Sequence, residues 1–253
     1  MKSRLNHRIV LLIFALGSLG LLSTIIIANA ASSGASSVTW TDDFEAASLD
    51  SRWSWIRNDP THWSLTERPG FLRITTNTQQ GPGEANNLLV QPVPVGDYEI
   101  QTRVQFTPTE NYQLAGLLVY QDDTTVVQLH RGFCDRPPPA CVNNGIYFDY
   151  IEDGNIIGSY HMTIPSQGDA YLKLIRQGPV YTGYASTDGV NWMMVGVYTT
   201  SITPSMIGLQ ASNNKQGDAE IPADFDFFTL VDKLNRLYLP FILNDVIQHE
   251  PLE

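Results

Sequence analysis

The chain has 253 residues, 43% of them hydrophobic, and its formal net charge is −11 at pH 7. This hydrophobic fraction excludes a chain that is disordered throughout, and the length suits one all-β domain of about 200 residues with short appendages. The excess of acidic side chains repels the phosphates of nucleic acids and of anionic lipid surfaces, so we expect no nucleic-acid partner.

Residues 1–30 have the composition of a signal peptide. Lysine and arginine lie near the start, an apolar run over 9–27 follows, and Ala28-Asn29-Ala30 is a small-residue cleavage motif. An uncleaved signal anchor is the alternative, because the run approaches the length that spans a bilayer. No second run of that length follows in the sequence. We therefore expect a secreted protein, or one tethered to the cell surface by its N-terminus, with no membrane span in the mature chain unless the signal is an uncleaved anchor.

The remaining chain divides into three parts by composition. Residues 31–37 (ASSGASS) predict a flexible linker. Residues 38–231 read as strand after strand, without an amphipathic helix. Residues 232–253 form a C-terminal tail whose apolar segment is interrupted by Pro240. A terminal strap packed on the domain and a docking or surface-retention element are both consistent with this tail.

A tryptophan-rich stretch at 53–76 (WSWIRNDPTHWSLTERPGFLRITT) organises the predicted domain. Three tryptophans precede Pro69-Gly70, which predicts a turn because proline presets φ and glycine accepts the positive φ that follows. After the turn Leu72 and Ile74 point one way and Arg73 the other, which is the two-residue period of a strand. The stretch indicates one edge of an aromatic-lined β-sandwich.

Further strands follow at regular spacing. Residues 98–106 alternate strictly, and the members expected to face the core are Tyr98, Ile100, Thr102, Val104 and Phe106. Other predicted strands cover 115–120, 126–131, 145–151, 155–162, 170–176, 180–186, 192–198, 207–211 and 224–230. Roughly a dozen short strands with turn signals between them predict two packed antiparallel sheets.

Cys134 and Cys141 are the only cysteines, and they flank a proline-rich loop. In an exported chain, an even count and a short spacing favour a disulfide that closes this loop. Two thiolates without a further Cys or His pair make a poor zinc site.

The sequence shows no convincing catalytic set. A retaining β-sandwich glycosidase places two acids on one strand face, about 5 Å apart. The nearest approach is the run 147–153 (YFDYIED), in which Asp149 could pair with Glu152 or Asp153. We expect no catalytic residues, and a stand-alone glycoside hydrolase that uses these acids is the alternative.

Side chains suited to sugar binding are easier to find, because sugars are held by aromatic faces together with amides, arginine and acids. The polar faces of two strands offer Gln101 and Arg103, and Gln128 and His130. Aromatic and basic side chains at Trp55, Arg57 and Tyr120 could supply a platform and rim, with Trp53 and Trp63 beside them. The alternative is that the tryptophans pack in the core and that the polar rows are a solvated outer face.

Several motifs carry a resemblance to a known family. They are WSLTERPG at 63–70, QLAGLLVY at 113–120, STDGVNW at 186–192 and DFDFF at 224–228. Together they resemble the concanavalin A-like C-terminal β-sandwich of family 43 glycoside hydrolases, the β-xylosidases and arabinofuranosidases, and related domains of unknown function. The resemblance covers about residues 40–230 and implies an all-β, concanavalin A-like (jelly-roll) antiparallel β-sandwich, often an accessory module beside a catalytic β-propeller.

The resemblance also sets limits. About 190 residues cannot hold both a sandwich and a propeller, so the catalytic acids of those enzymes cannot be carried over. The wider fold often binds structural calcium, and Asp43 and Asp226 occupy comparable places, although both could be ordinary strand-end acids. We expect a non-catalytic module that binds a plant-type or cell-surface polysaccharide or glycan and requires no cofactor. A structural or adhesive module without a sugar site is a further alternative.

Overall fold

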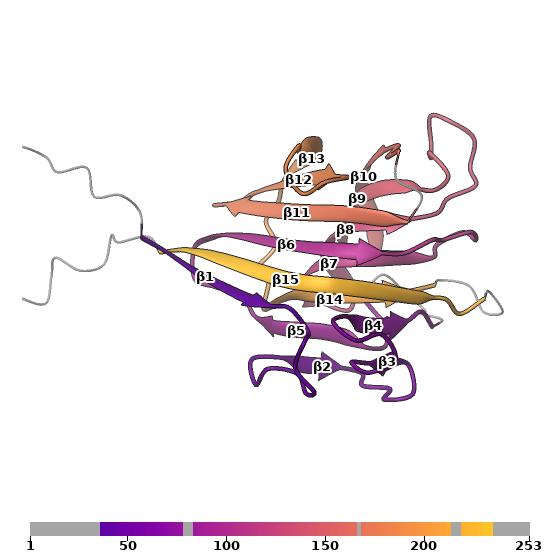
Figure 1. Cartoon of the computed structure of the whole chain (residues 1–253). Coiled ribbons are helices and arrows are strands. Elements are labelled where there is room, and N and C mark those ends of the chain that lie inside the picture. The colour runs from indigo at the N-terminus through magenta and orange to yellow at the C-terminus, as the bar shows by residue number, and fades with distance from the viewer. Residues whose placement is uncertain (1–35, 78–82, 166–167, 214–218, 235–253) are drawn as a thin grey trace, which may run out of the picture. The chain divides into compact units, whose positions relative to one another are not determined.

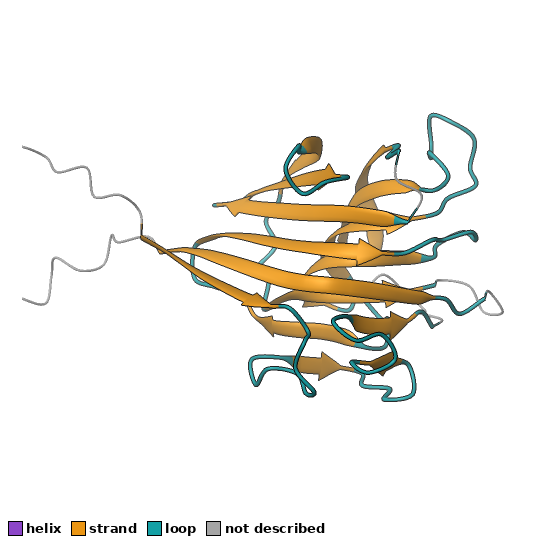
Figure 2. Ribbon diagram, in the orientation of Figure 1, coloured by secondary structure: helices purple, strands orange, loops and turns teal. Residues whose placement is uncertain are grey.

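The structure is a computed structural model that describes residues 36–77, 83–165, 168–213 and 219–234. The described elements are strands joined by loops (Figures 1 and 2). Their bounds are β1 Ser36–Asp42, β2 Ser54–Ile56, β3 Trp63–Ser64, β4 Leu72–Thr75, β5 Leu88–Pro92, β6 Asp97–Gln105, β7 Leu114–Asp122, β8 Thr125–Gly132, β9 Gly145–Glu152, β10 Asn155–Met162, β11 Asp169–Gln177, β12 Val180–Ser186, β13 Met193–Thr199, β14 Met206–Ser212 and β15 Pro222–Leu234. Within these ranges, we find no helix that is long and apolar enough to cross a membrane.

The strands form two antiparallel sheets. Sheet A has the order β13-β12-β11-β6-β15-β4-β3, with β1 paired to β15, and sheet B has the order β10-β9-β8-β7-β14-β5-β2. Neighbours in each sheet pair antiparallel, for example Thr102 with Phe228 and Gln128 with Asp149. The predicted all-β antiparallel sandwich is confirmed.

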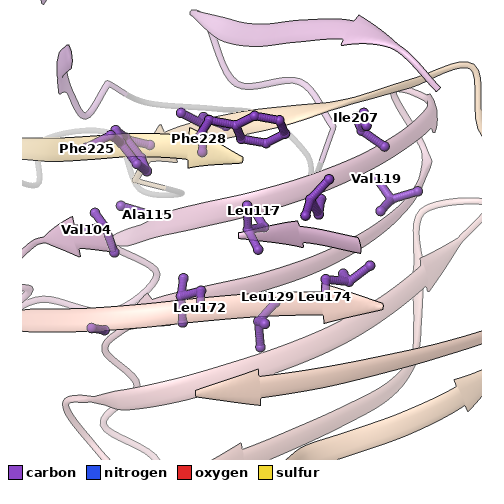
Figure 3. Close-up of a cluster of buried hydrophobic side chains, with 14 of the residues drawn as sticks. Val104, Ala115, Leu117, Val119, Leu129, Leu172, Leu174, Ile207, Phe225 and Phe228 are labelled. Carbon is purple, nitrogen blue, oxygen red and sulfur yellow. The ribbon is translucent and has the colours of Figure 1, made fainter. Parts of the chain in front are cut away.

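The core lies between the two sheets, and it forms because one side chain in two points inward. Of the five residues expected to face the core, four lie in β6 and Phe106 follows it directly, and all five are buried. Figure 3 shows side chains of both sheets meeting there, with Leu172, Leu174 and Phe225 from sheet A and Leu117 and Leu129 from sheet B. We call the opposite face of each sheet its outer face.

The tryptophan-rich stretch anchors one end of this core. Trp53 is buried, its ring lies edge-on to Phe228 at 5.0 Å between centroids, and its Nε1–H donates to Asp42 Oδ2 at 2.8 Å. The predicted turn is confirmed: Gly70 has φ +78° and leads into β4, where Leu72 and Ile74 are fully buried. A residue with a Cβ would be strained at that φ.

Some element bounds differ from those predicted. β1 begins at Ser36, so two residues of the predicted linker lie in a strand, because pairing with β15 satisfies their backbone groups whatever their side chains. β15 also continues beyond residue 231. β5 was not predicted, since it is buried on both faces and shows no alternation. The predicted signal peptide and the rest of the predicted tail lie outside the described residues.

Candidate functional site

A cleft of about 220 Å³ lies on the outer face of sheet B, over β8 and β9. Val127 and Leu129 of β8 point into the core, so the alternating Gln128 and His130 point outward. In β9, Phe148 points into the core and its two neighbours in the sequence point outward. Five outward residues of these two strands line the cleft, and they are Gln128, His130, Tyr147, Asp149 and Ile151.

The floor of the cleft is a hydrogen-bonded polar network. Asp149 Oδ2 accepts from His130 Nε2 at 2.9 Å and from Gln128 Nε2 at 3.3 Å. An ionised carboxylate only accepts hydrogen bonds, so the His130 Nε2 carries the proton. Gln128 Oε1 in turn accepts from Gln210 Nε2 at 2.7 Å. These bonds fix the orientation of the Asp149 carboxylate.

Aromatic rings lie in a row beside this network, and two of them, His130 and Tyr147, line the cleft. His130 and Tyr147 lie nearly parallel, with ring centroids 5.8 Å apart, and His161 of β10 lies 5.9 Å from Tyr147 on its other side. The Tyr147 hydroxyl donates to Asn143 O at 2.7 Å and accepts from Val142 N–H at 3.2 Å. Burial raises the pKa of Tyr147. The neutral phenol therefore ties the loop that follows the second cysteine to the sheet.

One wall of the cleft is the loop closed by the Cys134–Cys141 disulfide, which confirms the predicted pairing. Both cysteines line the cleft, as does Arg136 between them. The Arg136 Nη2 donates to the hydroxyl of Tyr112, a residue that is 41% exposed at the mouth of the cleft. On the other side the wall is formed by Ile156 and Ser159 of β10.

The structure does not bring the four predicted polar binding residues together. Gln101 and Arg103 lie on the outer face of sheet A, whereas Gln128 and His130 lie on the outer face of sheet B, on the other side of the core. Gln101 donates to Glu99, its neighbour on the same face. Periodicity correctly predicts that all four point outward, but it does not predict the sheet to which each strand belongs.

Arg103 has protein partners on its own face. Its guanidinium donates to Asp169 at 2.8 Å and to Asp226 at 3.0 Å. The hydrogen bond that Arg103 donates to Asp169 is the main reason that the pKa of Arg103 is raised, and the bond that it donates to Asp226 adds to it. Arg103 therefore joins β6 to β11 and β15.

The sequence interpretation placed Trp55 in the platform or rim of a sugar site. Its ring is instead partly buried and packs against the core. The ring also lies against Trp63, at 4.9 Å between centroids. Trp55 therefore forms no exposed platform, and the alternative that the tryptophans pack in the core describes it and Trp53.

Arg57 and Tyr120 form a clamp on Asp123. Arg57 Nη1 and the Tyr120 hydroxyl each donate to Asp123 Oδ1 at 2.7 Å. Arg57 also donates to the carbonyl oxygens of Gly83 and Ala85. Burial, helped by the nearby Asp123, raises the pKa of Tyr120 to about 12. The clamp holds residues 83–87 over a small apolar cluster on the outer face of sheet B, whose members are Ala85, Leu88, Val90, Leu118, Val126 and Ile151.

The two predicted calcium ligands do not form a suitable donor set. Asp226 already binds the Arg103 guanidinium, whose charge repels a divalent cation, and Asp43 Oδ1 accepts the Glu45 N–H at 3.2 Å. In the described part of the chain there is no group of three or more His, Cys, Asp or Glu side chains that could hold a metal ion.

The acids considered as catalytic partners are also separated. Asp149 lines the cleft, while the Glu152 carboxylate accepts from Ser201 Oγ at 3.4 Å on the other side of β9. Asp153 lies in the turn after the strand, with φ +50°. Among the described residues that line the cleft, Asp149 supplies the only carboxylate.

Two antiparallel sheets packed face to face define the β-sandwich class of proteins. Residues 41–231 match the family described as the beta xylosidase C-terminal concanavalin A-like domain. The chain belongs to this family, and the resemblance read from its motifs is confirmed.

Individual relatives are similar to this chain over the same region. A non-reducing end α-L-arabinofuranosidase of Bacteroides ovatus is 28% identical over 202 residues, which are 74% of this chain and 36% of the relative. A putative β-xylosidase of Escherichia coli is 36% identical over 83 residues, 32% of this chain and 16% of the relative. The chain thus spans about a third of the first curated relative and less of the second.

Solved structures share the fold. The GH43 protein BlXynB of Bacillus licheniformis matches with a TM-score of 0.66 and 22% identity, over 76% of this chain and 39% of that one. A functionally unknown protein of Saccharomyces cerevisiae matches with a TM-score of 0.54 and 15% identity, over 73% of this chain and 98% of that one. At these identities the likeness shows the fold alone.

Proposed function

We propose that this domain is a non-catalytic carbohydrate-binding domain that holds a glycan in the cleft of sheet B. The observation that carries the proposal is the Asp149 carboxylate, fixed by Gln128 and His130 at the floor of an aromatic-sided cleft. An oriented carboxylate accepts sugar hydroxyls, and aromatic faces pack against sugar C–H groups. Membership of a family named for β-xylosidases supports a polysaccharide ligand.

Weak binding is expected, because a cleft of about 220 Å³ covers little of a glycan and ordering costs offset much of the gain. The mouth is lined by Tyr112 and the apolar side chain of Ile156, and the floor supplies the polar groups. Such a domain would raise the local concentration of a glycan rather than transform it.

Export of the protein is part of the same proposal. The composition of residues 1–30 and the cleavage motif at Ala28-Asn29-Ala30 support it, and extracellular polysaccharide would then be within reach. A disulfide on the cleft wall suits an oxidising compartment.

Affinity electrophoresis in gels containing xylan, arabinoxylan or β-glucan tests the proposal. The wild-type protein is expected to be retarded by at least one of the three. Tyr112→Asn removes the ring at the mouth, and asparagine tolerates the φ of +67° at this position. We expect it to weaken binding about tenfold, on the order of 1.4 kcal/mol.

The matched control is Tyr160→Asn, which changes a tyrosine of similar exposure that lies outside the cleft. It should leave retardation unchanged. Retardation by none of the polysaccharides would instead favour a structural module, and release of reducing sugar from them by the purified chain would favour a glycosidase.

A further inference from the structure

We infer that the cleft accepts one neutral sugar residue, at the end or on a branch of a glycan, rather than a stretch of polysaccharide backbone. This inference rests on the proposed function and specifies its ligand. The argument uses the closure of the cleft on its sides, its volume and its charge.

The first closed side is towards the β7–β8 turn. Beside Gln128 the outward residue of β7 is Leu118, and the next outward residue along β8 towards the turn is Val126; both are fully buried. Residues 83–87 cover them, with Ala85 in the same apolar cluster and Arg57 bound to its carbonyl oxygen. A sugar chain cannot continue along the sheet in this direction.

The second closed side is towards the centre of the sheet. The outward row runs from His130 through Gly116 to Gln210. Gln210 is fully buried, although it lies on the outer face and its amide reaches Gln128. Gln113 is also fully buried where it lines the cleft. A ligand in the cleft can therefore contact no residue of this row beyond His130.

The disulfide loop and Tyr112 close a third side, and Ile156 and Ser159 stand on the fourth. The cleft volume of about 220 Å³ is below the roughly 300–1,000 Å³ of pockets that take drug-sized ligands. A cleft of this volume, closed on three sides and bordered on the fourth by exposed side chains of the edge strand β10, fits one sugar ring, whose glycosidic bond points out through the mouth.

The charge of the floor selects against acidic sugars. Asp149 Oδ2 is occupied by two N–H donors, and Oδ1 makes no hydrogen bond to the described residues. Oδ1 can accept hydroxyl protons of a vicinal diol, whereas a uronic acid carboxylate would lie against a fixed like charge. Among the described residues that line the cleft, Arg136 is the one arginine, and it is exposed and bound to Tyr112 rather than to the floor.

Calorimetric titration tests this inference with methyl glycosides of xylose, arabinofuranose, glucose and galactose, with xylotetraose, and with glucuronic acid. For the methyl glycoside that binds best, we expect a Kd within about threefold of that of a tetrasaccharide of the same sugar. Glucuronic acid should bind at least about tenfold more weakly than the neutral sugar. Asp149→Asn should reduce the difference in affinity between glucuronic acid and the neutral sugar, because an amide does not repel the carboxylate of glucuronic acid. The same variant should bind the neutral sugar more weakly than the wild type does.

Two neighbouring substitutions locate the site. Ile156→Trp places a larger ring at the mouth and should abolish binding, and Ile157→Trp is its matched control, since Ile157 is similarly exposed but does not line the cleft. Affinity that rises more than tenfold with chain length, or polysaccharide binding without binding of any methyl glycoside, would overturn the single-residue inference and leave the carbohydrate-binding proposal standing. If no glycan or polysaccharide binds, both the single-residue inference and the carbohydrate-binding proposal are wrong.

Discussion

Asp224 is a buried carboxylate held between two arginines on the outer face of sheet A. Its oxygens accept from Arg73 Nε and Arg68 Nη1, each at 2.7 Å, and the side chain is only 7% exposed. Burial opposes ionisation, but the hydrogen bonds and charges of Arg73 and Arg68 outweigh it and lower the pKa of Asp224. The group therefore stabilises the folded state in its ionised form.

This lowered pKa fixes the sign of a pH effect. The contribution of Asp224 is present above the ordinary carboxyl pKa of about 4 and is lost as the pH falls through the lower value of the folded state. Asp224→Asn should lower the free energy of unfolding at pH 7 by about 2 kcal/mol, because two partly exposed arginines lose their anion.

Urea unfolding between pH 7 and pH 2 measures the effect. The variant should lose less stability than the wild type on acidification, whereas Asp135→Asn, at an exposed carboxylate, should follow the wild-type curve. Parallel curves for the wild type and Asp224→Asn would show that Asp224 does not carry this pH dependence.

The disulfide loop is an element whose loss should affect both stability and binding. Cys134 and Cys141 are seven positions apart, and closing so short a loop stabilises a fold by about 2 kcal/mol. The loop is also a wall of the cleft, and the segment directly after Cys141 is held by the Tyr147 hydroxyl. Replacing both cysteines by serine should therefore lower the melting temperature and weaken glycan retardation.

The double serine variant is measured by thermal unfolding and by affinity electrophoresis, at a temperature where it is still folded. Unchanged retardation of a folded variant would mean that the wall does not contact the ligand. Reduction of the wild-type protein should give the same two effects, which separates loss of the bond from a packing effect of serine.

The local sequence pattern predicts most strands of this fold, but it predicts only part of the candidate site. Alternation predicted that Gln101 and Arg103, like Gln128 and His130, point outward, and they do. Which sheet a strand joins depends on long-range pairing, which a two-residue period does not encode. β8 and β9 pair in the structure, with His130 opposite Tyr147 and Gln128 opposite Asp149. The sequence analysis did not predict this pairing, so it did not bring these four residues together.

For the whole molecule, the central expectation concerns export. We expect expression in a secreting host to yield a chain that begins at Ala31, after cleavage behind Ala30, with its single disulfide formed. Intact mass spectrometry of the secreted protein, with and without reductant, measures both features. A chain that keeps residues 1–30 and stays with the membrane fraction would instead show that the segment is an anchor.

The pairing of β1 with β15 has a mechanical consequence. Ser36 lies opposite Leu234, so the chain enters and leaves the sandwich side by side, as Figure 1 shows for these two strands. A pulling force applied between these two points would load the backbone hydrogen bonds of this ladder one pair at a time, as in a zipper, rather than all at once. Under such a force β1 would therefore separate from β15 first, while the strands that form the cleft remain paired.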